Sequence, residues 1–230
     1  MPTLQADMEL RRCIDSIRLA LPDPGQCEIV VVLPARHLQQ AAQVLEGVRL
    51  VAETRRGVYG AMNDGMAAST GRYLYFVGKD DILLPAAADI VRLLAAEAPR
   101  LLFADVYWGD EGVRRGRTTR WLVLFRNVCQ QGIIYSREAV QANGPFLRQL
   151  RVQADHLLNI RALWEPAARG RVRYVAKPLA WYSATGLSFQ SRDTTFHKVH
   201  AAVIARYLGP VAGCLWRAYK RVRPEKMGPG

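Results

Sequence analysis

The chain has 230 residues, half of them hydrophobic, with 32 Lys and Arg against 20 Asp and Glu, a net charge of +12 and a pI near 10.0. Its length suits one α/β domain with a short appendage, and its charge favours anionic partners such as nucleic acid, phosphorylated small molecules or an acidic membrane surface, unless it forms only a solvated basic face. The four cysteines are widely spaced, which argues against a zinc site and against a disulfide scaffold. The sequence shows no leader-like opening and no apolar run near about 18 residues, so we expect neither secretion nor a membrane span. The expected compartment is a reducing cytoplasm.

The first half alternates between helical and strand-like patterns. Apolar residues recur at helical spacing from Leu10 to Leu21 and predict a helix over residues 8–21. After it we expect a buried strand at 27–33, a helix at 37–46, a strand at 48–53, a helix from Ala61 that ends at Gly71, a strand at 72–77, a helix at 86–98, a strand at 101–108 and a turn rich in glycine and arginine at 109–120. The alternation predicts a mostly parallel sheet flanked by helices, and ligands of such sheets bind beyond the carboxyl ends of the strands.

The second half is less regular. Its patterns predict a strand leading into a helix at 131–140, a helix at 154–164 that starts at Asp155, and a strand with an extended segment at 172–183. Gly209 and Pro210 divide the remainder into two short amphipathic helices.

The last of these helices combines an apolar face with basic residues. The apolar face consists of Val211, Leu215, Tyr219 and Val222. The basic residues around it are Arg217, Lys220, Arg221 and Arg223. This combination is typical of a helix that lies on an anionic bilayer, and equally of a helix docked on its own domain with a charged outer face.

Two adjacent carboxylates, Asp80 and Asp81, follow the strand at 72–77. Adjacent like charges repel unless a cation or donor groups lie between them. Paired carboxylates are suited to Mg²⁺ or Mn²⁺, with phosphate oxygens completing the coordination shell. They could instead only cap the turn into the next helix.

A longer segment bears on this choice. The stretch "ETRRGVYGAMNDGMAASTGRYLYFVGKDD" (53–81) resembles the core of family 2 glycosyltransferases with the GT-A fold, and is most similar to the bacterial polysaccharide-assembly branch that includes colanic-acid-type transferases. Residues 129–164 resemble the acceptor-side segment of that family, and "PLAWYSATGLS" (178–188) resembles its closing Gly-x-Ser stretch. The resemblance covers about residues 8–192.

The resemblance implies a domain organisation. A glycosyltransferase domain would span residues 1–192, with a donor half at about 1–108 and an acceptor half at about 121–192. Residues 193–230 would form a basic amphipathic helical extension.

The resemblance also implies roles on the donor side. Asp81 and Asp80 would hold Mg²⁺ or Mn²⁺ on the diphosphate of a nucleotide sugar, with Asp80 part of the donor site. Arg56 would lie near the nucleotide, while Asn63 and Gly65 would shape the floor of the donor site.

On the acceptor side, Asp155 would be the general base that takes a proton from the acceptor hydroxyl. It is also well placed as a plain N-cap of the helix at 154–164. Gln130 and Gln131 would hydrogen-bond sugar hydroxyls, unless they satisfy only their own strand ends.

The sequence departs from the family pattern at its beginning. The strand that usually precedes the first helix and helps to hold the nucleoside is absent, and Pro34 and Ala35 stand where an acidic, Gly/Ser-rich strand end is usual. Gly78 replaces a usual Asn or Asp of the metal motif. The expected fold is therefore a GT-A sheet without its first strand, with an exposed strand edge that something must cover.

These features predict an inverting glycosyltransferase that moves a sugar from a nucleotide diphosphate to a hydroxyl of a saccharide or lipid-linked saccharide in polysaccharide biosynthesis. The expected location is the cytoplasm, with the last helix in peripheral contact with the inner membrane. The alternative is an inactive relative that binds saccharide or nucleotide, or scaffolds an assembly complex. Nucleic acid is not expected as a partner, because no recognition helix or aromatic-interleaved basic strand is present.

Overall fold

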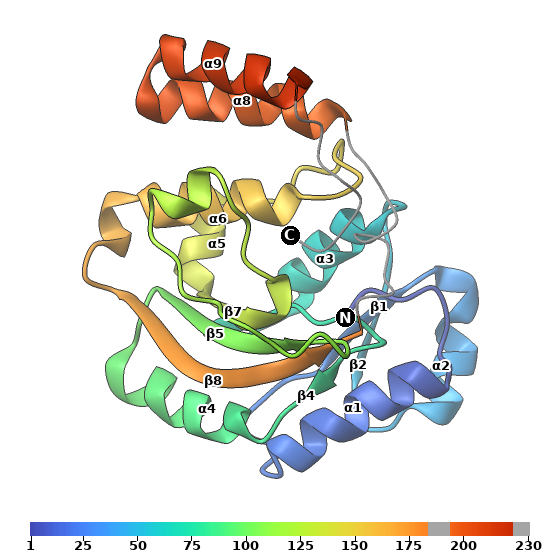
Figure 1. Ribbon diagram of the computed structural model, residues 1–230. Coiled ribbons are helices and arrows are strands. Elements are labelled where there is room, and N and C mark those ends of the chain that lie inside the picture. The colour runs from blue at the N-terminus through green and yellow to red at the C-terminus, as the bar shows by residue number, and fades with distance from the viewer. Residues whose placement is uncertain (184–193, 223–230) are drawn as a thin grey trace.

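The computed structural model describes residues 1–183 and 194–222, which form a curled, mixed sheet flanked by helices (Figure 1). The helices are α1 (Met8–Ala20), α2 (Leu38–Val44), α3 (Val58–Ala68), α4 (Ala86–Glu97), α5 (Arg137–Asn143), α6 (Ala154–Trp164), α8 (Thr194–Leu208) and α9 (Pro210–Val222). The strands are β1 (Val30–Leu33), β2 (Arg49–Ala52), β3 (Tyr73–Tyr75), β4 (Ile82–Leu83), β5 (Leu101–Trp108), β6 (Val113–Arg114), β7 (Ile133–Ser136) and β8 (Val172–Tyr182).

Helix α1 shows why the predicted elements form where they do. Asp7 is its N-cap, and the Asp7 carboxylate accepts a hydrogen bond from the Leu10 N–H at 3.1 Å. The apolar face that begins at Leu10 and Ile14 is buried, as its spacing predicts. Most other elements lie within two or three residues of the predicted bounds, and α3 begins at Val58 rather than Ala61.

The strand pairing differs from the mostly parallel sheet that the alternation predicts. The order of the main sheet is β3-β7-β5-β8-β4, with β6 paired to β5. Among the described strands only β1–β2 and β5–β8 are parallel pairs, and β7, β6 and β4 pair antiparallel with their neighbours. Parallel pairing needs a long crossover, whereas β6 returns directly from β5 through the glycine-containing turn at 109–112.

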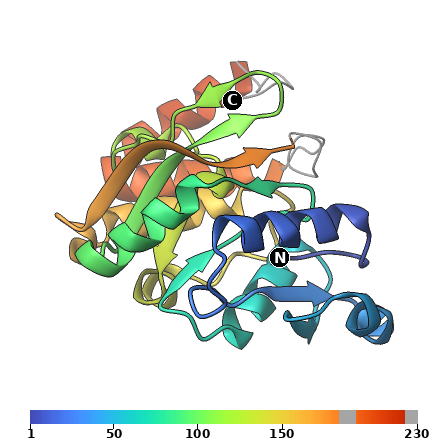
Figure 2. The same ribbon diagram turned by 90° about the horizontal axis from the view of Figure 1, so that it is seen from below.

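The first two strands form a separate sheet. Figure 2 shows β1, in blue, set apart from the green and orange strands of the main sheet. No named strand precedes β1 in the described chain, but residues 1–3 run alongside it: Pro2 forms a parallel bridge with Val32, and the amino group of Met1 donates to the Val30 carbonyl at 2.8 Å. Residues 1–3 therefore pair with part of the β1 edge that does not face β2.

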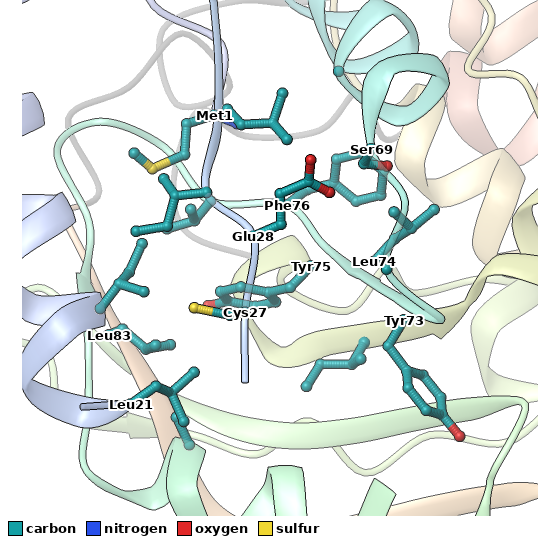
Figure 3. Close-up of a pocket in the computed structure, with 18 of the residues that line it drawn as sticks. Met1, Leu21, Cys27, Glu28, Ser69, Tyr73, Leu74, Tyr75, Phe76 and Leu83 are labelled. Atoms are coloured by element: carbon teal, nitrogen blue, oxygen red, sulfur yellow. The ribbon is translucent and has the colours of Figure 1, made fainter. Parts of the chain in front are cut away.

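An apolar cavity of about 380 Å³ lies between the edges of the two sheets (Figure 3). Its lining includes Met1, Cys27 from the segment before β1, and Tyr75 of β3. Leu21, which follows α1, and Leu83 of β4 line it as well. β1 and β3 are each the last strand of their sheet. The unpaired strand edge that the sequence predicts therefore borders this cavity, beside the main sheet.

The C-terminal helices stack on the acceptor half (Figure 1). Phe196 and His200 of α8 lie against His156 of α6, with ring centroids 5.5 and 5.0 Å from the His156 ring. The predicted break is confirmed, because Gly209 takes a φ of 92° between α8 and α9. A Cβ atom on Gly213 would lie 2.5 Å from the Ala205 Cβ, so α9 packs closely on α8.

Candidate active site

The turn after β3 sets Asp80 and Asp81 side by side, as the sequence predicts. The Gly78 N–H donates to the Asp81 carboxylate at 2.8 Å. A Cβ atom at position 78 would lie 2.7 Å from an Asp80 oxygen and 2.8 Å from an Asp81 oxygen. Glycine at this position therefore lets both carboxylates approach the same backbone, which a side chain would prevent.

Asp81 is the buried member of the pair, with only 1% of its surface exposed. It also accepts hydrogen bonds from the Gln131 side-chain amide at 2.8 Å and from the Ser183 N–H at 3.2 Å. Burial, and secondly the charge of Asp80, raise the pKa of Asp81 to about 6. The site thus holds negative charge in a place where water does not screen it.

The donor set of this turn fits a hard divalent cation. Two adjacent carboxylates repel each other and are stabilised by a bound cation, and Mg²⁺ or Mn²⁺ commonly takes one or two carboxylates and completes its shell with phosphate oxygens. The described residues contain no cluster of three or more His, Cys, Asp or Glu side chains that could hold a metal. A cation here would accordingly depend on ligand oxygens besides Asp80 and Asp81.

Asp155 lies in the first turn of α6 but does not cap it. The N-cap is Gln153, with a φ of 68°, so the N-cap reading of Asp155 is wrong. Its two carboxylate oxygens accept hydrogen bonds from the Tyr59 hydroxyl at 3.0 Å and the Asn127 amide at 2.7 Å. These contacts orient the carboxylate across α3 and α6, which N-capping would not require.

A chain of hydrogen bonds continues behind Asp155. The Asn127 carbonyl oxygen accepts from the Asn159 amide at 3.0 Å, and Asn159 accepts from the Tyr135 hydroxyl at 2.6 Å. Burial raises the pKa of Asp155, while the bonds from Asn127 and Tyr59 lower it. A carboxylate held in one orientation, with a raised proton affinity, is suited to act as a general base.

The remaining predicted donor residues occupy different positions. The Asn63 amide makes two hydrogen bonds to the Phe146 backbone, at 3.0 and 2.9 Å, so this side chain ties α3 to the acceptor half. A Cβ atom on Gly65 would lie 3.0 Å from Val32, so this glycine lets α3 pack against β1. Arg56 is exposed in the loop before α3. Contacts of Asn63, Gly65 and Arg56 with a donor stay predictions.

Gln130 and Gln131 have different contacts. The Gln131 amide donates to the Asp81 carboxylate at 2.8 Å, at the candidate metal-binding end. The Gln130 amide atoms are buried and have no hydrogen-bond partner among the described residues. Contact of either glutamine with a sugar hydroxyl stays a prediction. The Gly-x-Ser stretch at 186–188 lies outside the described residues.

The short segment at 127–131 connects the two ends of the site. Its first residue, Asn127, donates to Asp155, and its last, Gln131, donates to Asp81. Four residues of extended chain span at most about 14 Å. The carboxylate pair and the candidate base are thus held at opposite ends of one backbone segment, and neither Asn127 nor Tyr59 was expected as a site residue.

The fold and the site define a class, the GT-A type of glycosyltransferase. The model of the family described as glycosyl transferase family 2 matches residues 1–154, more than half of the chain. The chain is 33% identical over 191 residues to a PGL/p-HBAD biosynthesis glycosyltransferase of Mycobacterium tuberculosis (strain ATCC 25177 / H37Ra), and equally to one of Mycobacterium bovis (strain BCG / Pasteur 1173P2), which covers 76% of this chain and 72% of each relative. The chain belongs to glycosyl transferase family 2.

Solved structures confirm the fold at low sequence identity. TarS residues 1–349 of S. aureus, in complex with UDP-GlcNAc, superposes with a TM-score of 0.71 at 15% identity and covers 95% of this chain and 69% of its own. The mannosyltransferase PcManGT from Pyrobaculum calidifontis, in complex with GDP-Man and Mn²⁺, gives 0.57 at 15% identity, over 98% and 74%. The family and the GT-A fold are confirmed, and the colanic-acid-type branch stays a prediction.

Proposed function

We propose that this protein is an inverting glycosyltransferase, which moves a sugar from a nucleotide diphosphate to a hydroxyl of a saccharide or lipid-linked saccharide. The observation that carries this is the segment at 127–131, which holds a base-like carboxylate, Asp155, at one end and the Asp80–Asp81 pair at the other. A single-displacement transfer needs these two functions on opposite faces of the sugar.

In this reaction Asp155 accepts the proton of the acceptor hydroxyl. The hydroxyl oxygen forms a bond to the anomeric carbon as the bond to the diphosphate oxygen breaks, and the nucleoside diphosphate leaves with the bonding electrons. Tyr59 and Asn127 hold the carboxylate at the angle that the proton transfer requires. Attack from the face opposite the leaving group inverts the configuration.

Asp80 and Asp81 would hold Mg²⁺ or Mn²⁺, and the bound ion would neutralise charge on the diphosphate. Support for a nucleotide-sugar donor comes from the structural neighbours with bound UDP-GlcNAc and GDP-Man. The 33% identical relatives are named PGL/p-HBAD biosynthesis glycosyltransferases, and we assign this chain a role as a glycosyltransferase of polysaccharide biosynthesis.

The direct test is release of nucleoside diphosphate from UDP-, GDP- and dTDP-sugars, with a bacterial lipid extract as acceptor, in Mn²⁺ and in chelator. We expect release from one nucleotide class, dependent on both the extract and the metal, with the opposite anomeric configuration in the product. Retained configuration would contradict the single-displacement reaction.

A second candidate function rests on the cavity between β1 and β3. A donor site flanked by a divided sheet suits a relative that binds saccharide or nucleotide, or scaffolds an assembly complex, without catalysis. In that case Asp155→Asn would change neither ligand binding nor any product formed in the test above.

For a membrane location, the support comes from α9. One face of this helix packs on α8, while its apolar stripe stays exposed: Val211 at 71%, Leu215 at 66% and Val222 at 81%. Phe125, itself exposed, lies against Trp216 of α9 with ring centroids 5.2 Å apart. Exposed arginines accompany both segments, and each basic residue near an anionic surface contributes about 1 kcal/mol. No helix in the described part of the chain is long and apolar enough to span a bilayer.

This surface is tested by co-sedimentation with phosphatidylcholine vesicles, with and without phosphatidylglycerol. We expect binding only to the anionic vesicles, reduced by Leu215→Glu. Leu19→Glu on α1 is the matched control, because Leu19 is at least as exposed as Leu215 and lies on another helix. An equal effect of both substitutions, or dimerisation through α9 in light scattering without vesicle binding, would contradict a membrane-facing stripe.

A further inference from the structure

A small arginine-lined pocket lies beside the acceptor end of the site. Its volume is about 40 Å³, enough for a few waters or one tetrahedral anion. Four arginines line it: Arg114, Arg115, Arg117 and Arg126. Three of them come from the "RRGRTTR" stretch, whose high arginine content none of the roles above uses.

The loop that carries these arginines is tightly fixed. A Cβ atom on Gly116 would lie 2.0 Å from the Ala104 carbonyl oxygen, so only glycine lets the loop approach β5 this closely. The Gly116 N–H donates to Asp105 at 2.9 Å, and the Arg114 guanidinium stacks 3.6 Å from the centroid of the Trp108 ring. The loop backbone and the Arg114 guanidinium are therefore held by the fold, while the side chains of Arg115, Arg117 and Arg126 are exposed.

The pocket carries uncompensated positive charge. Arg114 pairs with Glu111 at 2.9 Å, but Arg115, Arg117 and Arg126 form no ion pair with a carboxylate among the described residues. If the Asp105 carboxylate neutralises one of these three arginines, two positive charges remain. Trp108 also lines the pocket, and its buried indole N–H has no hydrogen-bond acceptor within residues 1–183 and 194–222. Clustered donors of this kind bind phosphate.

The position of the pocket identifies which phosphate it suits. Asn127 lines the pocket and also donates to Asp155 at 2.7 Å, so the pocket adjoins the candidate base. Leu122, another lining residue, is exposed, and so is Phe125, whose ring lies against Trp216 of α9 with centroids 5.2 Å apart. A phosphate held here would lie between the apolar surface and Asp155, as in a lipid whose head carries a phosphate followed by a sugar.

We propose that the pocket binds a phosphate group of the acceptor, and that the acceptor is a saccharide joined to a lipid through phosphate. This assignment rests on the glycosyltransferase function proposed above and names its acceptor class. Arg117 and Arg126 hold the phosphate from two separate segments, and Asp155 then meets a hydroxyl of the attached sugar.

The test is calorimetric binding of farnesyl phosphate, below its micellar concentration, to the full chain. We expect Arg117→Gln and Arg126→Gln each to weaken binding about tenfold, since each removes a charge-assisted hydrogen bond. Arg92→Gln on α4, an exposed arginine across the sheet, is the matched control and should change nothing. Farnesol, which lacks the phosphate, should bind weakly and equally to all variants.

Other arms separate the possible sources of phosphate. An equal loss of UDP binding in Mn²⁺ would assign the pocket to the donor and overturn the proposal. Inorganic phosphate binding as tightly as farnesyl phosphate, or farnesyl phosphate binding unchanged by both substitutions, would overturn it as well. Asp155→Asn should leave farnesyl phosphate binding intact, so the result is independent of whether the protein catalyses transfer.

Discussion

The two ends of the candidate site are built differently. Around Asp155 the side chains of Tyr59, Asn127, Asn159 and Tyr135 form a continuous set of hydrogen bonds inside one hydrophobic core. Beside Asp81 the sheet is divided, and a cavity of about 380 Å³ separates β1 from β3. The comparison indicates that the candidate base is preorganised by the fold, whereas the candidate nucleotide side depends more on its ligands for order.

Removing the base should have the largest effect. Asp155→Asn should lower transfer by about 10²- to 10⁴-fold with donor affinity unchanged, because a general base acts only in the chemical step. Nucleoside diphosphate release and calorimetric donor binding measure the two quantities. Asp110→Asn, in an exposed turn, is the control. Full turnover by Asp155→Asn would move the base elsewhere and remove the first half of the comparison.

Changing the donor end should affect binding instead. Asp81→Ala should abolish the Mn²⁺-dependent part of nucleotide binding, and Asp81→Asn should do so while keeping one amide oxygen as acceptor for either the Gly78 or the Ser183 N–H. Calorimetry in Mn²⁺ and in chelator makes the measurement, with Asp89→Asn on α4 as control. If both Asp81 variants bind nucleotide as the unaltered protein does, the carboxylates do not hold the metal.

The divided sheet should open more readily than the main sheet. We expect amides of β1 and β2 to exchange on the order of a hundredfold faster than those of β5 and β7, because a two-stranded sheet beside a cavity is less protected. Hydrogen exchange read by mass spectrometry tests this, and nucleotide with Mn²⁺ should slow β1 and β2 selectively. Equal exchange in both sheets would erase the contrast.

Removing a hydrogen bond that orients Asp155 should have a smaller effect than replacing Asp155 itself. Tyr59→Phe removes the hydroxyl that donates to Asp155 and accepts from Ala154, and should lower transfer about tenfold. The Tyr59 bond lowers the pKa of Asp155, so its loss raises that pKa further. Since the base must be ionised, the acid limb of the kcat profile should move to higher pH. Tyr73→Phe, with its hydroxyl on backbone carbonyls at 94 and 99, is the control, and an unshifted acid limb would argue against this role.

Local patterns predict the elements but not all of their pairings. The helix over 8–21, the break at Gly209 and the Asp80–Asp81 turn follow from spacing and residue type alone. The antiparallel returns of β7 and β4 and the division of the sheet do not, because they depend on which strands meet in space.

The same limit applies to the site. Tyr59 and Asn127 lie 96 and 28 residues from Asp155 in sequence, and only folding brings their side chains to its carboxylate. Tyr59 at least belongs to the segment that resembles the family, which could have drawn attention to it. Nothing around Asn127 in the sequence marks it, since its role arises from a short segment that joins two sites.

The central claim is that Asp80 and Asp81, with Gln131 bonded to Asp81, form a metal-dependent donor site. The most direct measurement is calorimetric binding of UDP, GDP, dTDP and CMP to the full chain, each with Mn²⁺ and with chelator. The account predicts that one nucleotide binds, that chelator abolishes the binding, and that Gln131→Ala weakens it through Asp81. Binding of none of the four, or binding that chelator leaves unchanged, would contradict it.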